Sequence, residues 1–389
     1  MLSVRTFLIP PVLITGSGSS EKVGEESKKL GVKKALIVTD QVMVKLGVLE
    51  GVKKALEQTK IQFAIYDAVA TEPTVDYVKE GLKSFKDNGC DFVMAVGGGS
   101  PIDTAKAIAI MATNPGSIEE YKGLGKVTKE GAPLIAIPTT AGTGSEVTQF
   151  TIITDTKTSV KMLIGSPFVM PKVAIVDPLL TLSSPRGLTA AVGIDSLTHA
   201  IEAYVSVKAQ PMSDIFCLSA IEFISGNLRQ AWANGNNVEA REKTMLGALQ
   251  AGIAFTNASV ALVHGMSRPI GAYFHVAHGA SNAALLGVVT EFSLIGNPAR
   301  YGHIARAMGE NVTGLTDLEA AQLAAKAIKT LIKDIQIPSL RGLGVEKGKL
   351  EQLAPKMAED AIASGSPGNN PRQATKEEIV ELYKIAGSQ

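Results

Sequence analysis

The sequence predicts an α/β domain with a parallel sheet, followed by an all-α domain. From residue 4 to about residue 185, short apolar runs alternate with amphipathic helical stretches, which indicates a parallel sheet covered on both faces. After Ser183-Ser184-Pro185 these runs stop, and apolar residues recur at helical spacing. The 389 residues are enough for two or three domains that each bury a core. We therefore predict domains at 1–185 and 186–389.

The predicted elements follow in order along the chain. Strands are expected at 34–39, 62–66, 91–96, 133–137 and 173–176, with helices between them at 21–30, 51–58, 74–88 and 101–112. In the second half, helices are expected at 188–207, 212–233, 238–255 and 318–335. Ligands of such proteins bind in the cleft between domains, beyond the carboxyl ends of the strands.

Composition excludes several classes of protein. Thirty-eight Lys and Arg against 37 Asp and Glu give a formal net charge of +1, so no basic excess indicates a nucleic-acid partner. No window approaches the ~18 uninterrupted apolar residues of a membrane span, and no signal peptide is recognised. Cys90 and Cys217 indicate neither a disulfide framework nor a zinc ribbon. We expect a cytoplasmic protein with no membrane partner.

A glycine-rich turn follows the strand at 91–96. Gly97, Gly98 and Gly99 precede Ser100, and Asp103 lies in the first turn of the next helix. Glycines let the backbone approach an anion closely, and a helix N-terminus adds free N–H groups and a positive dipole end. Ser100 suits the N-cap, and Asp103 can complete a capping box. We favour pyrophosphate binding for the glycines, whereas capping alone explains Asp103 equally well.

Polar residues also follow two other predicted strands. Asp40 ends the strand at 34–39, where a carboxylate can bind both ribose hydroxyls of adenosine and repel a 2′-phosphate, which favours NAD over NADP. The alternative, favoured from the sequence alone, is that Asp40 caps the next helix. Thr139, Thr140 and Thr143 follow the strand at 133–137. They can contact a nicotinamide ribose or phosphate, or simply form a turn.

Four of the five histidines lie in two short segments that indicate a metal site. Asp195 and His199 are four residues apart, so both project from one face of a helix. His264 begins a second segment, in which His275 or His278 can return another imidazole. Carboxylate and imidazole donors without thiols suit Fe(II), Zn, Mn, Co or Ni and argue against a structural zinc cage. The fifth histidine, at 303, is expected to be structural or at the surface.

Five motifs in order carry a resemblance over essentially the whole chain. They are GGGSPIDTAK (97–106), PTTAGTGSEVT (138–148), GIDSLTHAIEAY (193–204), VHGMSRPIGA (263–272) and HVAHGASNA (275–283). The sequence resembles the iron-containing (group III) alcohol dehydrogenase family, especially its lactaldehyde reductase, propanediol dehydrogenase and butanol dehydrogenase branch. The resemblance implies a Rossmann-like dinucleotide-binding domain and a helical metal domain, in a dehydroquinate synthase-like architecture with catalysis in the cleft.

The resemblance also implies site residues and an assembly. The metal ligands would be Asp195, His199, His264 and His278. Cofactor contacts would come from Asp40, Gly97, Gly98, Gly99, Ser100, Asp103, Thr139, Thr140, Thr143 and Lys161. The family dimerises through its N-terminal strand, here at about 4–9, so a homodimer or a higher homo-oligomer is expected.

Three positions depart from the family pattern. Arg268 stands where many members have a histidine credited with proton transfer, and His275 where relatives often have a smaller polar residue. Glu72 stands where relatives often have asparagine near the cofactor. His275 is our hypothesis for the proton shuttle, because its unperturbed pKa of ~6.5 suits that work. Equally supported is a packing role for His275, with the proton passing through water and a ribose hydroxyl.

The predicted function is reversible hydride transfer between NAD(H) and a small primary alcohol or aldehyde bound to Fe(II). Arg268 lies one helical turn after His264 and could clamp a carboxylate or sulfonate, so a hydroxy acid, an ω-semialdehyde or sulfoacetaldehyde is an alternative substrate. We favour instead an internal salt bridge of Arg268, for example to Glu202 or Asp214. More distant alternatives are a dehydroquinate synthase-like lyase or cyclase, and a non-catalytic metal or nucleotide sensor.

Overall fold

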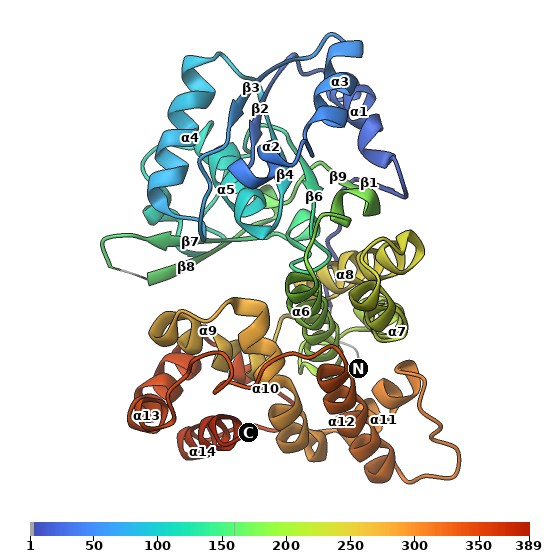
Figure 1. The fold of residues 1–389 in the computed structure, drawn as a ribbon. Helices are drawn as coiled ribbons and strands as arrows, with labels where there is room; N and C mark the ends of the chain where they lie inside the picture. The colour runs from blue at the N-terminus through green and yellow to red at the C-terminus, as the bar shows by residue number, and fades with distance from the viewer. Residues whose placement is uncertain (1–3, 159) are drawn as a thin grey trace. The chain divides into compact units, whose positions relative to one another are not determined.

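The computed structural model describes residues 4–158 and 160–389. The chain divides into two compact units, of which one contains Leu8–Ser183 and the other contains Ser184–Gln389 together with the chain before Leu8. A parallel sheet with helices makes up the first unit, and helices make up the second (Figure 1). The predicted fold class is therefore confirmed.

A six-stranded parallel sheet forms the centre of the first unit. Its strand order is β1-β9-β6-β4-β2-β3. The strands are β1 (Val12–Thr15), β2 (Lys34–Val38), β3 (Gln62–Tyr66), β4 (Phe92–Gly97), β6 (Leu134–Pro138) and β9 (Val173–Val176). The sequence prediction missed β1, a half-buried edge strand of four residues that follows two prolines.

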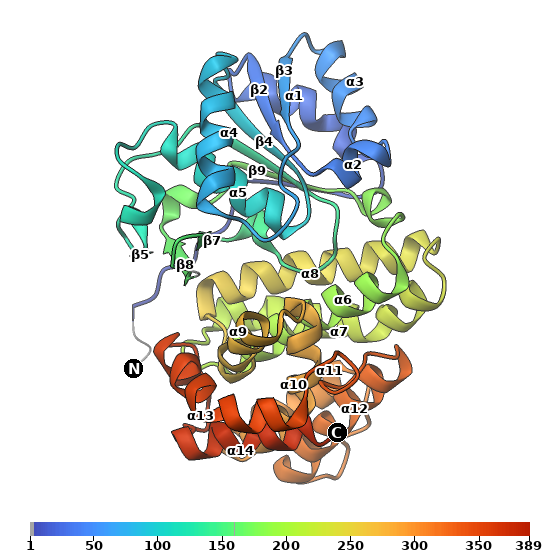
Figure 2. The ribbon, with the colours of Figure 1, turned by 60° about the vertical axis from the view of Figure 1, so that its left-hand side comes forward.

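Helices cover both faces of this sheet (Figures 1 and 2). On one face, α1 (Val23–Lys29) and α3 (Glu50–Gln58) pack against alternate strand residues such as Ala35 and Ile37. On the other face, α4 (Val75–Asp87) and α5 (Gly99–Met111) pack against Leu36 and Val38. Neighbouring residues of β2 alternate between the two cores, as expected for a strand that is buried on both faces.

A small second sheet in the same unit was not predicted. It contains β5 (Gly123–Leu124), β8 (Val160–Gly165) and β7 (Phe150–Asp155), and the last two are antiparallel. Only alternate residues of β7 are buried, and much of β8 is exposed. Such half-exposed strands lack the continuous apolar run on which the prediction of the other strands depended.

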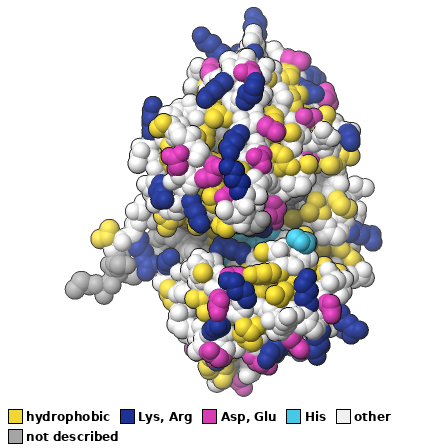
Figure 3. Space-filling model, turned by 90° about the vertical axis from the view of Figure 1, so that its left-hand side faces the viewer, with side chains coloured by type: hydrophobic (Ala, Val, Ile, Leu, Met, Phe, Trp, Pro, Cys, Tyr) yellow, Lys and Arg dark blue, Asp and Glu magenta, His cyan; other side chains and the backbone are white. Residues whose placement is uncertain are grey.

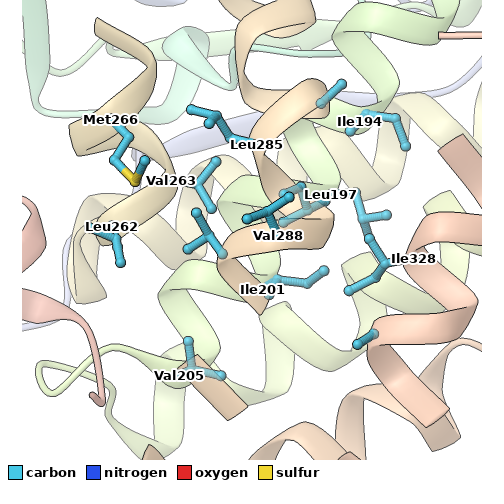
Figure 4. Close-up of a cluster of buried hydrophobic side chains, with 14 of the residues drawn as sticks. Ile194, Leu197, Ile201, Val205, Leu262, Val263, Met266, Leu285, Val288 and Ile328 are labelled. Atoms are coloured by element: carbon cyan, nitrogen blue, oxygen red, sulfur yellow. The ribbon is translucent and has the colours of Figure 1, made fainter. Parts of the chain in front are cut away.

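The second unit consists of packed helices around one core. They are α6 (Arg186–Val205), α7 (Pro211–Ala233), α8 (Val238–Ala258), α9 (Leu262–Phe274), α10 (His278–Ser293), α11 (Pro298–Ala307), α12 (Asp317–Asp334), α13 (Lys347–Ala363) and α14 (Lys376–Gly387). Figure 4 shows side chains of α6, α9 and α10 meeting in that core, among them Leu197, Val263 and Val288. These three helices carry the histidine motifs.

The expected N-terminal strand at about 4–9 is absent from the single chain, in which residues 4–10 form no strand. A strand that pairs with a second copy has no hydrogen-bond partner within one chain, so a single chain does not show it. Val4 is fully exposed in this segment.

The surface and the helices bear on the predicted partners. The view in Figure 3 shows Lys and Arg interspersed with Asp and Glu rather than gathered into a field of one sign.

The stretch at 278–296 is long and apolar enough to cross a membrane, but 67% of it is buried inside the protein. The bent pair α8 and α9 is long and apolar enough only when both helices are taken together. A buried core helix of a soluble protein has the same composition, so this stretch is weak support for a span.

Candidate active site

Two of the predicted metal ligands lie on α6. Asp195 and His199 are one turn apart, and both are buried. The i, i+4 spacing places both side chains on one face of the helix. Burial would raise the pKa of Asp195, but the nearby imidazoles of His199, His278 and His264 outweigh that effect and lower it well below its usual range. The carboxylate is therefore held ionised, as a metal ligand must be.

A sharp bend brings the third predicted ligand to this pair. The axes of α8 and α9 differ by 103°, and Ser259 at the bend has a left-handed φ of 67°. His264 lies in the first turn of α9, and its ring stacks on that of His199 with centroids 4.4 Å apart. Each of Asp195, His199 and His264 offers one potential ligand atom, and these three atoms lie within 4.8 Å of one another.

The fourth predicted ligand, His278, begins α10. Its Nε2 lies 3.8 Å from Oδ1 of Asp195, and Nε2 of His264 lies 3.7 Å from the same oxygen. Two ligands bonded at about 2.1 Å to one tetrahedral ion would be about 3.4 Å apart. These separations and the donor set, one carboxylate and imidazoles without a thiol, fit one divalent ion. His278 itself lies outside the group of mutually close ligand atoms, which contains Asp195, His199 and His264.

Glu202 orients one of these imidazoles and was missed by the sequence prediction. Its Oε2 accepts a hydrogen bond from Nδ1 of His264 at 2.6 Å, and its Oε1 accepts one from the backbone N of Val263 at 2.5 Å. A proton on Nδ1 leaves Nε2 free to face a metal. Burial would lower the pKa of His264, but Glu202 and Asp195 raise it to about 9. The available signal was the spacing of Asp195, His199 and Glu202 at i, i+4 and i+7 on one helical face.

Asn282 lies among the ligand atoms and was also missed. Its Nδ2 is 2.6 Å from Oδ1 of Asp195, and 3.2 and 3.3 Å from the Nε2 atoms of His264 and His278. The side chain is fully buried, and its Oδ1 has no hydrogen-bond partner among the described residues. Its position four residues after His278, on the same face of α10, was the available signal.

Arg268 forms neither of the expected salt bridges. Glu202 accepts hydrogen bonds from Val263 and His264, and Asp214 forms an ion pair with Arg300. Within the chain at 4–158 and 160–389, no ion pair or hydrogen bond of the Arg268 guanidinium is found, although the side chain is partly buried. The favoured expectation of an internal salt bridge to Glu202 or Asp214 is therefore wrong, because both carboxylates bind other donors.

The two remaining histidines lie outside the cluster of potential ligand atoms. His275 is exposed and ends α9 with a left-handed φ of 57°, three residues before His278. A proton-shuttle role for His275 stays a prediction. His303 is exposed on α11, where its Nδ1 lies 2.7 Å from the hydroxyl of Tyr204. This contact ties α11 to α6.

Three loops meet at one edge of the six-stranded sheet. Strands β2, β4 and β6 are neighbours, and Asp40, Gly97 to Ser100 and Thr139 to Thr143 follow their carboxyl ends. Helix α5 begins at Gly99 with Gly98 as its N-cap, two residues earlier than predicted. Ser100 is therefore in the first turn rather than at the N-cap. The free N–H groups of this turn face the same edge, which suits a phosphate.

The glycines of this turn have packing reasons as well. A Cβ on Gly97, where φ is 158°, would lie 2.6 Å from Pro101, and one on Gly99 would lie 2.7 Å from Thr143. A Cβ on Gly98 would meet only Thr140, at an ordinary 3.5 Å. Internal packing therefore accounts for two of the three glycines, and only Gly98 remains to be explained by the close approach of a ligand.

Two predicted cofactor residues make contacts within the protein. Asp103 accepts hydrogen bonds from Oγ of Ser145 at 2.5 Å and from the backbone N of Ile152 at 2.9 Å, so it fastens α5 to neighbouring segments and forms no capping box. Lys161 on β8 forms an ion pair with Glu72 at 2.6 Å. The lysine thus already has a carboxylate partner at the surface.

The other predicted cofactor residues remain at the sheet edge. Asp40 is the N-cap of α2 (Gln41–Lys45), where it accepts a hydrogen bond from the N of Met43 at 2.9 Å. Thr140 and Thr143 are partly exposed, whereas Thr139 is buried and its hydroxyl has no partner among the described residues. A buried hydroxyl without a partner at the edge where a cofactor would lie is compatible with a ligand donor or acceptor there.

A buried charged cluster behind this edge was not predicted. Nζ of Lys106 donates to Oγ1 and O of Thr148 at 2.8 and 2.9 Å and to O of Phe150 at 2.7 Å. Burial lowers the pKa of Lys106 to about 8 and raises that of Glu146 to about 7, while their opposite charges limit both shifts. Lys106 thereby joins α5 to the loop after β6.

Comparisons with known proteins match both units. Residues 10–178 match the family "Iron-containing alcohol dehydrogenase", and residues 189–387 match "Fe-containing alcohol dehydrogenase family, C-terminal". The chain is 43% identical to the 1,3-propanediol dehydrogenase of Citrobacter freundii, covering 99% of this chain and 100% of the relative. It is 41% identical to the NAD-dependent methanol dehydrogenase of Bacillus methanolicus, covering 98% and 100%.

Comparison with solved structures supports the same family. A crystal structure of a 1,3-propanediol oxidoreductase superposes with a TM-score of 0.96 at 42% identity, covering 99% of this chain and 100% of that one. The family and the branch expected from the five motifs are thus confirmed. The chain therefore belongs to the iron-containing alcohol dehydrogenase family, and it is an NAD-linked, metal-dependent alcohol and aldehyde oxidoreductase.

Proposed function

We propose that the protein interconverts a small primary alcohol and its aldehyde with NAD(H), at an Fe(II) ion held by Asp195, His199, His264 and His278. The observation that carries the proposal is the close approach of ligand atoms from Asp195, His199 and His264, with Nε2 of His278 3.8 Å from the carboxylate of Asp195. In the reductive direction, aldehyde, NADH and one proton give alcohol and NAD⁺. When bound, the ion supplies Lewis acidity that polarises the carbonyl oxygen.

Three side chains of the protein prepare that site for the ion. The ionised carboxylate of Asp195 supplies the negative charge, and Glu202 holds the His264 ring with Nε2 directed toward the other ligands. Asn282 donates to Asp195 and keeps its carboxylate in one rotamer. Fe(II) tolerates more than four ligands, which leaves room for a substrate oxygen, although Zn, Mn, Co and Ni suit the same donors.

We assign dinucleotide binding to the first predicted domain, 1–185, and metal binding to the second, 186–389. In the first domain, the N–H groups at Gly98, Gly99 and Ser100 would bind the pyrophosphate. Thr139, Thr140 and Thr143 would contact the nicotinamide ribose, and Asp40 the adenosine ribose. Asp103 and Lys161 would act only indirectly, because each already has a partner.

We propose His275 as the residue that exchanges the proton with solvent. Its exposure supports this role, since a shuttle must reach water. An unchanged pH–rate profile in His275→Ala would remove it from the mechanism. We also propose that the protein is cytoplasmic. We propose that it assembles as a homodimer through the segment at about 4–9, most of which is exposed, and light scattering of the purified protein would test this assembly.

The test of the proposed function is NADH oxidation by protein reconstituted anaerobically with Fe(II). We expect turnover of short aldehydes that a chelator abolishes and that added Fe(II) restores. His199→Ala should lose both bound iron and turnover, whereas His303→Ala, which changes a histidine outside the cluster, should keep both. A protein that binds iron and NADH but oxidises no NADH with any aldehyde would contradict the proposal and favour a lyase or a sensor.

A further inference from the structure

Arg268 is the exception among the arginines of the helical unit that are at least partly buried. Arg241 donates to Thr189 and to two backbone oxygens, Arg300 pairs with Asp214, and Arg372 pairs with Glu378. Arg268 is partly buried in α9, yet no hydrogen bond or ion pair of its guanidinium is found within 4–158 and 160–389. The described protein therefore provides this cation with no counter-ion in contact.

A partly buried guanidinium without a partner is unfavourable. Removing a charge from water costs free energy unless hydrogen bonds or an opposite charge replace the lost water. Burial lowers the pKa of Arg268, and the charge of Glu202 only partly opposes that effect. Glu202 cannot move to form the ion pair without giving up its hydrogen bonds to Val263 and His264. An anion from outside the chain would satisfy the guanidinium without that loss.

The position of Arg268 on α9 places such an anion close to the metal ligands. His264 and Arg268 are four residues apart, so their side chains share a face of the helix, with Cβ atoms about 5–6 Å apart. That separation matches the length of a short substrate. An aldehyde of two to four carbons with its carbonyl oxygen near Nε2 of His264 would extend its other end toward Arg268.

We propose that Arg268 binds an acidic group at the far end of the substrate, so that the preferred substrates are short aldehydes bearing a carboxylate or a sulfonate. A guanidinium presents two parallel N–H donors to either group, which gives stronger and more directional binding than an ammonium. This inference rests on the proposed function, since it names the substrate class of the same metal site. It makes Arg268 a specificity residue rather than the proton donor.

The test compares pairs of aldehydes that differ mainly in the acidic group. Butanal is paired with 4-oxobutanoate, and propanal with sulfoacetaldehyde, using Fe(II)-loaded protein and NADH at constant ionic strength. We expect kcat/KM of the wild type to be at least about 10-fold higher for the anionic member of one pair. The pair that shows the preference tells a carboxylate site from a sulfonate site.

Variants of Arg268 then assign the preference to this residue. In Arg268→Gln the ratio of kcat/KM for anionic over neutral aldehyde should fall by about 10- to 100-fold, mostly through KM. Arg268→Lys should keep part of the preference, because it retains the charge but not the paired donors. Arg306→Gln is the matched control, since Arg306 is exposed on α11 and belongs to no part of the site.

A binding measurement makes the test independent of turnover. Calorimetry with 2-hydroxyethanesulfonate and 4-hydroxybutanoate should detect binding to wild type and Arg306→Gln, and at least about 10-fold weaker binding to Arg268→Gln. Equal loss of neutral and anionic turnover in Arg268→Gln would overturn the inference and make the arginine structural. A wild type that prefers neutral aldehydes would overturn it too, while leaving the proposed function intact. Absence of turnover with every aldehyde would instead contradict the proposed function itself.

Discussion

Nδ1 of His264 donates a hydrogen bond of 2.6 Å to Oε2 of Glu202, and both side chains are buried. The second oxygen of Glu202 accepts from the N of Val263, so one carboxylate satisfies two donors. Glu202→Gln keeps the shape but supplies a single acceptor, which leaves one donor without a partner. We expect the affinity for Fe(II) to fall by about 10- to 100-fold, measured anaerobically by competition with a chromophoric chelator.

Glu222→Gln on α7 is the matched control for that experiment. Glu222 is exposed and is not one of the residues of the site, so the same change of charge there should leave the affinity for Fe(II) as in the wild type. If Glu202→Gln bound iron as tightly as this control, the carboxylate would not orient His264.

Asn282 should set the geometry of the metal site through Asp195. Its Nδ2 donates to Oδ1 of Asp195 at 2.6 Å, and truncation to alanine would release that carboxylate. We expect Asn282→Ala to bind Co(II) about 10- to 100-fold more weakly, with a changed visible absorption spectrum of the bound Co(II). A purely structural residue would alter stability without moving that spectrum. Asn227→Ala is the control, because the amide of Asn227 donates to a backbone oxygen one turn away on α7 and, among the described residues, to no predicted ligand.

The sequence predicted four helices of the second unit, α6, α7, α8 and α12, and the potential ligands, because their signals are local. It predicted no bounds for α9, α10, α11, α13 or α14. The spacing of Asp195 and His199 on one helical turn can be recognised without knowing the fold, as can the glycine turn between a strand and the helix that follows it. Glu202 and Asn282 were missed because their partners are 62 and 87 residues away, and a polar residue on a helix is ordinary until its neighbours are known.

Two errors, one at the sheet edge of the first unit and one on α9 of the helical unit, have the same physical origin. A capping box was one of the roles considered for Asp103, but its carboxylate accepts a hydrogen bond from the N of Ile152 on β7. The apolar runs did not reveal this half-exposed strand. Arg268 was expected in a salt bridge because buried charges usually pair. In the structure, Glu202 and Asp214 bind other donors instead. No local sequence pattern indicates which donors a carboxylate will bind.

A substitution of Asp40 can test the choice between NAD and NADP, because it can remove the charge of this residue while keeping its role as a helix cap. Asp40→Asn removes the charge but still caps α2, because an asparagine oxygen can accept from the N of Met43. We expect the ratio of kcat/KM for NADPH over NADH to rise by about 10-fold, since repulsion of the 2′-phosphate is gone. Asp40→Gly should raise the same ratio with some loss of stability. An unchanged ratio in both variants would tell against the contact with ribose.

The buried carboxyl of Glu146 should make the stability of the protein fall with rising pH. Burial raises its pKa to about 7 in the folded state, whereas the unfolded chain has the ordinary value of 4.5. Between these values the folded state binds more protons than the unfolded state, so the free energy of unfolding decreases as pH rises from 4.5 to 7. Glu146→Gln removes this contribution, which is at most about 3 kcal/mol.

Urea unfolding at intervals from pH 5 to pH 7.5 would measure that contribution as a difference between variants. The stability gained by Glu146→Gln over the wild type should increase with pH across this window, whereas Glu57→Gln, exposed on α3, should track the wild type. The opposite sign is expected from Lys106, whose pKa is lowered by burial to about 8. Above that pH the folded state loses a proton that the unfolded state retains, so the free energy of unfolding rises again. Parallel curves for Glu146→Gln and the wild type would show that Glu146 is ionised in the folded protein, held by Lys106.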